Sequence, residues 1–534
     1  MSTRILRGAR ILTLNPQNPV ASTLAIAQGR ILAAGQEEPI LAAYGNSASI
    51  HNLDGLFVLP GLTDAHIHLQ HYALNLQKID CEVPTKAECL KRVEERARNA
   101  SPGSWILGHG WDHNYWTDGF GTAADLDAIA PHNPVYLTAK SLHASWINSR
   151  AMEAAGIDIH TTDPVDGKIL RFENGQPTGT LLEGASALVA AVIPEPSLPE
   201  VEAAIQQAIP RLWEMGITGV HDFDGAQCFE ALQNLHFVGD LKLRVLKSIP
   251  LENLSSAIAV GLRSGFGDDW LRIGGVKIFM DGALGPQTAA MLQAYDNSTN
   301  NSGMLFISSE TLLETGKQAI EHGISLAIHA IGDRANRAAL DALELLRRSE
   351  HSSQGAQSPS LLRHRLEHVQ ILHPKDLPRL AELGVIASVQ PIHATSDMLV
   401  ADRYLGRRAR YAYAWRSLLE HNTLLAFGSD APVDKPNPFA GLYAAVTRRR
   451  EDGFPGREGW HPEQRLPIAE ALHGFTTGPA WAAGMENHVG RLAPGFLADL
   501  LILDRSPLDC SPGELKDLKP LATMVGGEWV YWNL

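Results

Sequence analysis

The chain has 534 residues, of which 45% are apolar and 19% are charged, a composition typical of a globular protein with two or three domains. Its net charge of −14 argues against nucleic acid or an anionic membrane as a partner, because both require basic surface. The four cysteines show no Cys-x-x-Cys spacing and no apolar run reaches membrane-helix length, so we expect a cytoplasmic protein without a disulfide framework.

Both ends of the chain have the pattern of short β-strands. The N-terminal stretch ILRGARILTL alternates polar and apolar residues, which favours a strand over a signal peptide, and TLAIAQGRILAAG continues the pattern. The C-terminal stretches LADLLILD and TMVGGEWVYW have the same character. We therefore expect residues 1–58 and 488–534 to pair in one small β-sandwich domain.

Between these ends, in residues 59–487, strand and helix patterns alternate. ISLAIHAIG, VIASVQP and TLLAFGSD are apolar runs that end in polar residues, as buried parallel strands do. DRANRAALDALELLRRS and HPKDLPRLAELG have the spacing of helices between them. Repeated βα units in this number predict a closed (β/α)8 barrel of the TIM type.

About 140 residues separate the first predicted barrel strand from the strand ITGVHDF, which is more than one or two βα units need. Within them, KAECLKRVEERARNA is an amphipathic helix, and GKILRFENGQPTGTLLEGA has the turn signals of a β-hairpin. We predict an inserted subdomain at residues 75–200 over the barrel mouth.

Residue types that bind metals stand at the downstream ends of the predicted strands. Because these ends converge in a barrel, the set predicts one metal centre. Two histidines spaced i and i+2 on a strand also face the same side. Each residue alone has a simpler interpretation: a core histidine, an aspartate that caps a helix, or a lysine paired with a carboxylate. The residues are His66, His68, Lys277, His329, His368 and Asp430.

The order of these residues resembles the amidohydrolase superfamily of metal-dependent hydrolases. VLPGLTDAHIHL, GVKIFMDGALGPQTA, AIHAIGD, RLEHVQ, GSDAPV and GRLAPGFLADLLILD carry the resemblance, which is closest to the YtcJ-like branch with its N-substituted formamide deformylases. Imidazole and carboxylate ligands suit two zinc ions, with manganese, iron or cobalt as replacements. The resemblance implies that His66, His68 and Asp430 hold one ion, His329 and His368 hold the other, and Lys277, carboxylated by carbon dioxide, bridges them.

Two bound ions would supply hydroxide at neutral pH, with Asp430 as the proton shuttle. The predicted function is hydrolysis of a carbon–nitrogen bond in an amide, N-formyl or N-acyl substrate. A deaminase, lactonase or phosphotriesterase on the same metals is one alternative. A non-catalytic regulatory homologue is another, although it would be expected to have lost ligands, and all six are present.

Further polar and aromatic residues are candidates for contact with the small-molecule substrate. These are His143, Trp111, Asp281 and Gln390. His393 is interpreted as structural or solvent-exposed, and the glycine-rich stretch GHGWDHNYW as a loop. Besides the substrate, the one expected partner is a second copy of the chain in a homodimer.

Overall fold

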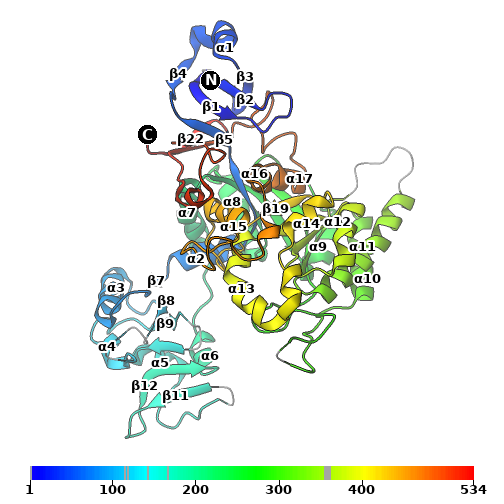
Figure 1. Cartoon of the computed structure of the whole chain (residues 1–534). Coiled ribbons are helices and arrows are strands. Elements are labelled where there is room, and N and C mark those ends of the chain that lie inside the picture. The colour runs from blue at the N-terminus through cyan, green and yellow to red at the C-terminus, as the bar shows by residue number, and fades with distance from the viewer. Residues whose placement is uncertain are drawn as a thin grey trace. The chain divides into compact units, whose positions relative to one another are not determined.

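The computed structural model describes residues 3–112, 116, 119–140, 144–164, 167–296, 298–353 and 362–534. It divides into two compact units, one with residues 1–72 and 205–534 and the other with residues 73–204 (Figure 1). None of the helices in the described residues is long and apolar enough to cross a membrane.

An eight-stranded parallel sheet forms the barrel of the larger unit, and its strands follow one another in chain order. The segment after β19 meets the end of β6 through two hydrogen bonds: the Asp430 amide donates to the His66 carbonyl (2.7 Å), and the His68 amide donates to the Ala431 carbonyl (2.9 Å). Gly428 permits this approach, because a Cβ there would lie 2.4 Å from the His66 nitrogen. The barrel predicted from the sequence is confirmed. Its strands are β6 (Leu62–Ile67), β13 (Ile217–Asp222), β14 (Arg244–Pro250), β15 (Leu271–Phe279), β16 (Leu326–Ala330), β17 (Arg365–His368), β18 (Ile386–Val389) and β19 (Leu425–Phe427).

Helices follow most barrel strands and cover the sheet from outside (Figure 1). The largest apolar core includes Leu326 and Ile328 of β16 and Leu343 and Leu346 of α11, all fully buried. Burial of this apolar surface is the main force that holds helices to strands. The helices of this unit after the first barrel strand, of which α2 and α7 also include residues of the smaller unit, are α2 (Leu69–Leu76), α7 (Leu198–Glu214), α8 (Ala226–Phe237), α9 (Leu254–Ala259), α10 (Ser309–Glu321), α11 (Asp333–Ser353), α12 (Leu377–Glu382), α13 (Pro391–Leu405), α14 (Trp415–Glu420), α15 (Pro438–Thr447), α16 (Ile468–Gly474) and α17 (Thr477–Ala482).

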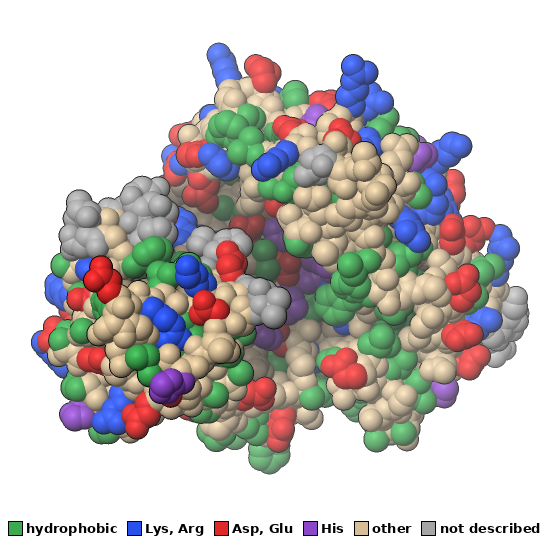
Figure 2. Space-filling model, turned by 90° about the horizontal axis from the view of Figure 1, so that it is seen from below, with side chains coloured by type: hydrophobic (Ala, Val, Ile, Leu, Met, Phe, Trp, Pro, Cys, Tyr) green, Lys and Arg blue, Asp and Glu red, His purple; other side chains and the backbone are tan. Residues whose placement is uncertain are grey.

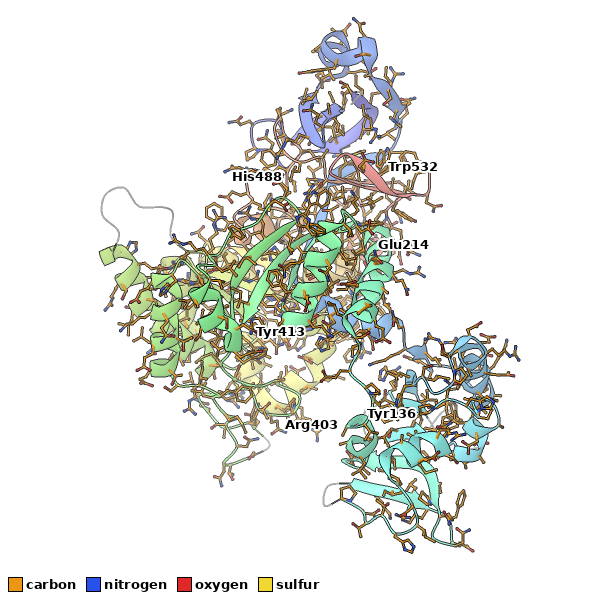
Figure 3. The ribbon with its side chains drawn as sticks, turned by 180° about the vertical axis from the view of Figure 1, so that it is seen from behind. Tyr136, Glu214, Arg403, Tyr413, His488 and Trp532 are labelled. Carbon is orange, nitrogen blue, oxygen red and sulfur yellow. The ribbon has the colours of Figure 1, made fainter. Side chains whose placement is uncertain are left out.

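A second eight-stranded sheet of the larger unit is built from both ends of the chain. β20 runs antiparallel to β5, with Leu501 opposite Leu59. Figure 3 labels Trp532, at the end of β22, on this sheet. Its strands are β1 (Arg4–Leu12), β2 (Val20–Ala27), β3 (Arg30–Gly35), β4 (Ser49–Asn52), β5 (Phe57–Pro60), β20 (Leu500–Leu503), β21 (Ala522–Val525) and β22 (Glu528–Trp532), with helix α1 (Glu37–Tyr44) beside them.

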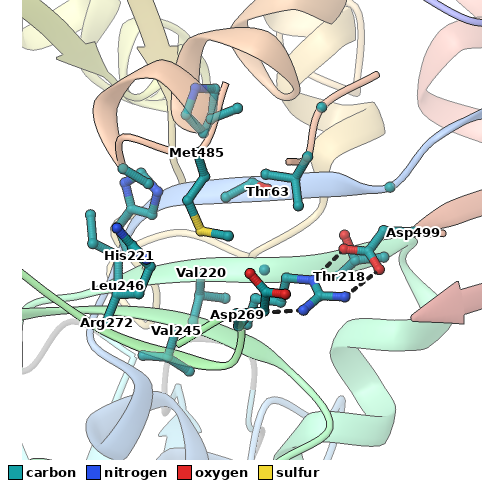
Figure 4. Close-up of a pocket in the computed structure, with 18 residues that line it drawn as sticks. Thr63, Thr218, Val220, His221, Val245, Leu246, Asp269, Arg272, Met485 and Asp499 are labelled. Atoms are coloured by element: carbon teal, nitrogen blue, oxygen red, sulfur yellow. Dashed lines mark hydrogen bonds and ion pairs between the residues drawn. The ribbon is translucent and has the colours of Figure 1, made fainter. Parts of the chain in front are cut away.

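A buried ion pair ties the terminal sheet to the start of the barrel. Arg244, the first residue of β14, donates from Nη2 to Oδ1 of Asp499 (2.7 Å), and both side chains are buried. The pair lines a pocket that also includes Thr63, Thr218 and Val245, at the amino ends of the barrel strands (Figure 4). This pocket is therefore at the opposite end of the strands from the predicted metal ligands.

The smaller unit has a six-stranded sheet of its own. The stretch GHGW belongs to strand β8, which corrects the predicted loop, because β8 pairs with β7 and β9 on its two sides. The placement of this unit over the barrel mouth stays a prediction. Its elements are β7 (Ile79–Asp80), α3 (Lys86–Asn99), β8 (Ile106–Trp111), α4 (Ala123–Asp127), β9 (Val135–Ala139), β10 (Ala144–Ile147), α5 (Ser149–Ala155), β11 (Gly167–Arg171), β12 (Pro177–Glu183) and α6 (Ser186–Ala190).

Candidate metal centre

The structure brings the six predicted ligand residues together at the carboxyl ends of the barrel strands. In the view of Figure 2, histidine side chains lie deep between the surrounding surface side chains. The residues come from the ends of five strands: His66 and His68 at β6, Lys277 on β15, His329 on β16, His368 on β17 and Asp430 after β19.

His66, His68 and Asp430 form the tightest group. Oδ1 of Asp430 lies 3.5 Å from Nε2 of His66 and 3.3 Å from Nε2 of His68. One ligand atom from each of the three lies within 4.8 Å of the others. Two imidazoles and a carboxylate at this spacing suit zinc or a similar divalent ion.

The remaining three residues adjoin this group. Nζ of Lys277 lies 3.5 Å from Nε2 of His66. The His368 ring is centred 4.5 Å from that of His329 and 4.9 Å from that of His66. The structure thus gathers all six residues, while their division between two ions stays a prediction.

Each of the four histidines has one ring nitrogen already held by a hydrogen bond. The other ring nitrogen can then bind a cation. In metalloproteins, hydrogen bonds of this kind fix the tautomer and the orientation of the histidines that bind the metal. The held nitrogens are His66 Nδ1 by Glu367 (2.6 Å), His68 Nδ1 by Asp224 (3.0 Å), His329 Nε2 by the Gly282 carbonyl (3.1 Å) and His368 Nδ1 by Gln390 (2.9 Å).

The electrostatics of the cluster favour neutral imidazoles at three of the four positions. Burial, and next the Lys277 charge, lower the pKa of His66 to about 4 and that of His329 to about 3. Burial also holds the pKa of His368 well below its usual value. At His68 the effect of burial is outweighed by hydrogen bonds to Asp224 and Asp430, which raise its pKa to about 9. Neutral imidazole is the form that binds metals.

Lys277 is buried in a position that disfavours its charge. Burial lowers the pKa of its amine to about 8. The Nζ atom lies 4.4 Å from the centre of the Phe223 ring and 5.0 Å from that of Phe279. Among the residues that the structure describes, no carboxylate oxygen lies within 4.0 Å of Nζ. The structure therefore offers no support for the simpler interpretation of Lys277 as half of an ion pair.

Two residues of the cluster have left-handed backbone conformations. His368 has a φ of 74° and Asp430 a φ of 59°. Such angles are uncommon outside glycine, and they concentrate at functional sites, where they aim side chains that regular strands would turn away. For Asp430 the cost is small, since Asp and Asn tolerate this region well.

The predicted substrate contacts lie in different parts of the structure. Trp111 is 1% exposed, lies in the core of the smaller unit and donates to the Leu137 carbonyl (2.8 Å), while its contact with a substrate stays a prediction. Asp281 is buried and accepts from the Ile331 and Gly332 amides (3.0 and 2.8 Å), which shapes the loops beside His329.

The other two candidates have different outcomes. Gln390 contacts the site by holding His368. His143 lies outside the described residues.

Several residues of the site were missed from the sequence. Glu367 and Asp224 hold ligand histidines, and His393, expected to be structural or exposed, is buried with Nε2 3.9 Å from Oδ2 of Asp430. A usable signal existed for Glu367: Arg365 and Glu367 alternate in the short buried strand RLEH, where charges need partners.

Comparisons with known proteins find similarity over nearly the whole chain. A family model described as "Amidohydrolase family" matches residues 49–531. The chain is 34% identical to Protein LONG AFTER FAR-RED 3 of Arabidopsis thaliana, over 99% of this chain and 91% of the relative. It is 31% identical to the Bacillus subtilis protein YtcJ, named as an amidohydrolase, over 99% of both chains.

Two further comparisons bear on activity and fold. The chain is 30% identical to the N-substituted formamide deformylase of Arthrobacter pascens, over 99% of this chain and 98% of the relative. A crystal structure of a metal-dependent hydrolase from Pyrococcus furiosus superimposes with a TM-score of 0.78 at 29% identity, covering 95% of this chain and 100% of that one. The resemblance drawn from the sequence phrases is confirmed.

The contact between Glu367 and His66 predicts an effect on metal binding. Replacing Glu367 by Gln keeps its shape and removes the charge that orients His66, so we expect zinc affinity to fall about 10- to 100-fold, measured by competition with a chelator. Glu350→Gln is the matched control, because Glu350 also joins an arginine, Arg347 (2.6 Å), to a buried histidine, His364 (3.0 Å), outside the cluster. Equal losses of zinc affinity in both variants would contradict the specific role of Glu367.

Proposed function

The chain belongs to the amidohydrolase family, and we propose that it is a metal-dependent hydrolase that cleaves the carbon–nitrogen bond of an N-formyl or N-acyl amide. The observation that carries this proposal is the convergence of four imidazoles, one carboxylate and a buried lysine at one end of the barrel. Its likeness to a formamide deformylase over nearly the full length supports the choice of bond. When bound, divalent ions activate water and polarise a carbonyl group.

The donor set fits such ions. His66, His68 and Asp430 would hold one ion, and His329 and His368 a second, each histidine through the ring nitrogen other than the one held by Glu367, Asp224, Gly282 or Gln390. Zinc is the first choice for imidazole and carboxylate ligands, with manganese, iron or cobalt as replacements.

Lys277 would join the two halves of the site as a carbamate. Its neutral amine adds to carbon dioxide and releases one proton, which gives a group with two ligand oxygens. Burial supports this step, since it lowers the pKa of the amine to about 8 and so favours the neutral form. The Nζ atom lies over the Phe223 and Phe279 rings, and among the described residues no carboxylate oxygen lies within 4.0 Å to compete for the amine.

Asp430 is the proton carrier in this proposal. Its Oδ1 faces His66 and His68, and its Oδ2 faces His393 across 3.9 Å. The histidines outweigh the opposing effect of burial and hold the pKa of the carboxyl well below its usual value, so it is an available base. It would take a proton from the attacking water and pass it to the leaving nitrogen.

The proposed bond specificity can be tested by a substrate screen. Purified, zinc-loaded protein should hydrolyse N-formyl or N-acyl amines faster than lactones, cyclic amides or phosphotriesters, with free amine measured for the amides and released acid measured for the lactones and phosphotriesters. Preference for a lactone or phosphotriester, or no turnover by protein that holds its metal, would overturn the assignment.

A second prediction concerns Lys277. Lys277→Ala should lose zinc and activity, because the bridging oxygens are gone, and millimolar formate or acetate should partly restore both by filling the same space. Lys247→Met is the matched control, since Lys247 is a buried lysine of the neighbouring strand that is paired with Asp222 (2.9 Å). Carboxylic acids should rescue only the first variant. Full zinc content in Lys277→Ala would rule out the bridge.

A third prediction separates the two proposed roles of Asp430. Asparagine keeps an oxygen of similar reach and tolerates the left-handed backbone at this position, so Asp430→Asn should retain much of its zinc. It cannot carry a proton at neutral pH, and kcat should fall by about 10² to 10⁴. The shuttle role is wrong if the zinc-loaded variant keeps more than about a tenth of wild-type kcat on an amide with a poorly acidic leaving amine.

A further inference from the structure

Three buried side-chain atoms beside His368 have no hydrogen-bond partner among the described residues. They are Oε1 of Gln370, Nε2 of Gln390 and Nε2 of His393, in side chains that are 4%, 2% and 6% exposed. Buried polar atoms in proteins are nearly always paired, so each exception calls for a reason. Three such atoms next to His368, a proposed metal-binding residue, indicate polar groups that face a bound small molecule.

His393 has the best position of the three. It lies in the first turn of α13, and its ring is stacked on the His368 ring, with centres 6.2 Å apart and planes at 10°. Its Nε2 lies 3.9 Å from Oδ2 of Asp430 and 3.6 Å from Oδ2 of Asp434. Both distances exceed a hydrogen bond, so neither carboxylate satisfies this nitrogen.

The surroundings of the ring place its hydrogen on Nε2. The Gln370 amide nitrogen, which can only donate, lies 3.5 Å from Nδ1 of His393, so Nδ1 is the acceptor. The carboxylates of Asp430 and Asp434 both lie on the Nε2 side, where they favour a hydrogen over a lone pair. His393 therefore presents a buried N–H beside the proposed proton carrier.

We propose that the Nε2–H of His393 donates a hydrogen bond to the oxygen of the scissile carbonyl and holds it more strongly as negative charge develops there. The inference rests on the proposed function. Asp430 must reach the leaving nitrogen to give it a proton, and the carbonyl oxygen is bonded to the same carbon as that nitrogen. A donor next to Asp430, in a site sheltered from water, is thus placed to stabilise the transition state.

A competing role for His393 is metal ligation. One ligand atom each from His368, His393 and Asp430 lies within 4.8 Å of the others. The two roles differ in what a substitution removes: a lost ligand lowers metal content, whereas a lost donor leaves the metal in place.

The test compares His393→Leu, which has no donor, with His393→Gln, whose amide N–H has a similar reach. In zinc-loaded His393→Leu we expect kcat/KM on the best amide of the screen to fall about 10²- to 10³-fold, mainly through kcat. Zinc content should be unchanged. Affinity for methylphosphonate, a tetrahedral anion measured by calorimetry, should fall about 10-fold or more, as for a lost hydrogen bond to a charged group. His393→Gln should recover most of both losses.

His461→Leu is the matched control, because Nε2 of His461 is also buried without a partner, and its loss should leave methylphosphonate affinity unchanged. Loss of zinc in His393→Leu would make His393 a ligand and overturn the inference, as would unchanged methylphosphonate affinity. If wild type cleaves no amide but methylphosphonate binding still depends on His393, the carbon–nitrogen assignment fails while the donor role stands.

Discussion

The carboxylate of Glu367 joins the interior of the barrel to the candidate metal centre. It accepts hydrogen bonds from Nε of Arg365 (2.5 Å) and from Nδ1 of His66 (2.6 Å), and all three side chains are buried. Arg365 also donates to Oγ of Ser388 (2.6 Å). Because alternate residues of a strand face the same side, β17 points Arg365 and Glu367 inward and Leu366 toward the helices. By the same alternation, the His368 side chain would point toward the helices. The left-handed backbone at His368 breaks the alternation and turns this side chain to the barrel mouth.

Such a buried network of charges is a poor source of stability. Removing a charged pair from water costs about as much as the pair regains, and well-packed apolar replacements are often neutral or better by about 1–4 kcal/mol. Arg365 and Glu367 therefore need another reason to be inside the barrel. Orientation supplies one: a charge-assisted hydrogen bond holds the His66 ring at a fixed angle and leaves Nε2 toward Asp430.

The convergence of the six candidate ligands could be predicted because their signal is local. An apolar run followed by a polar residue marks the end of a buried strand, and barrel geometry then brings such ends together. The partners of the ligands have no comparable signal. Asp224 contacts His68 from a different strand end, and sequence gives no register between them. Trp111 shows another limit of prediction from sequence. An aromatic residue near glycines has the same local pattern whether it packs in a core, as Trp111 does, or lines a pocket.

His393 was expected to be structural or solvent-exposed, and the structure shows it buried in the first turn of α13, with its ring stacked on that of His368. The sequence does not give this contact, because a polar residue near the start of a helix has the same local pattern whether it is solvated or buried.

Every candidate ligand histidine is held by a group from a different part of the chain, and this couples the candidate metal centre to the barrel. Glu367 of β17 holds His66 of β6 across the barrel interior, and Gln390, after β18, holds His368 of β17. A shift of one strand would therefore misdirect a ligand on another. By the same coupling, an ion bound only by the native arrangement stabilises the closed barrel, by a free energy that grows with the logarithm of one plus the ratio of ion concentration to Kd. The polar interior, costly in itself, thus makes fold and metal binding depend on each other.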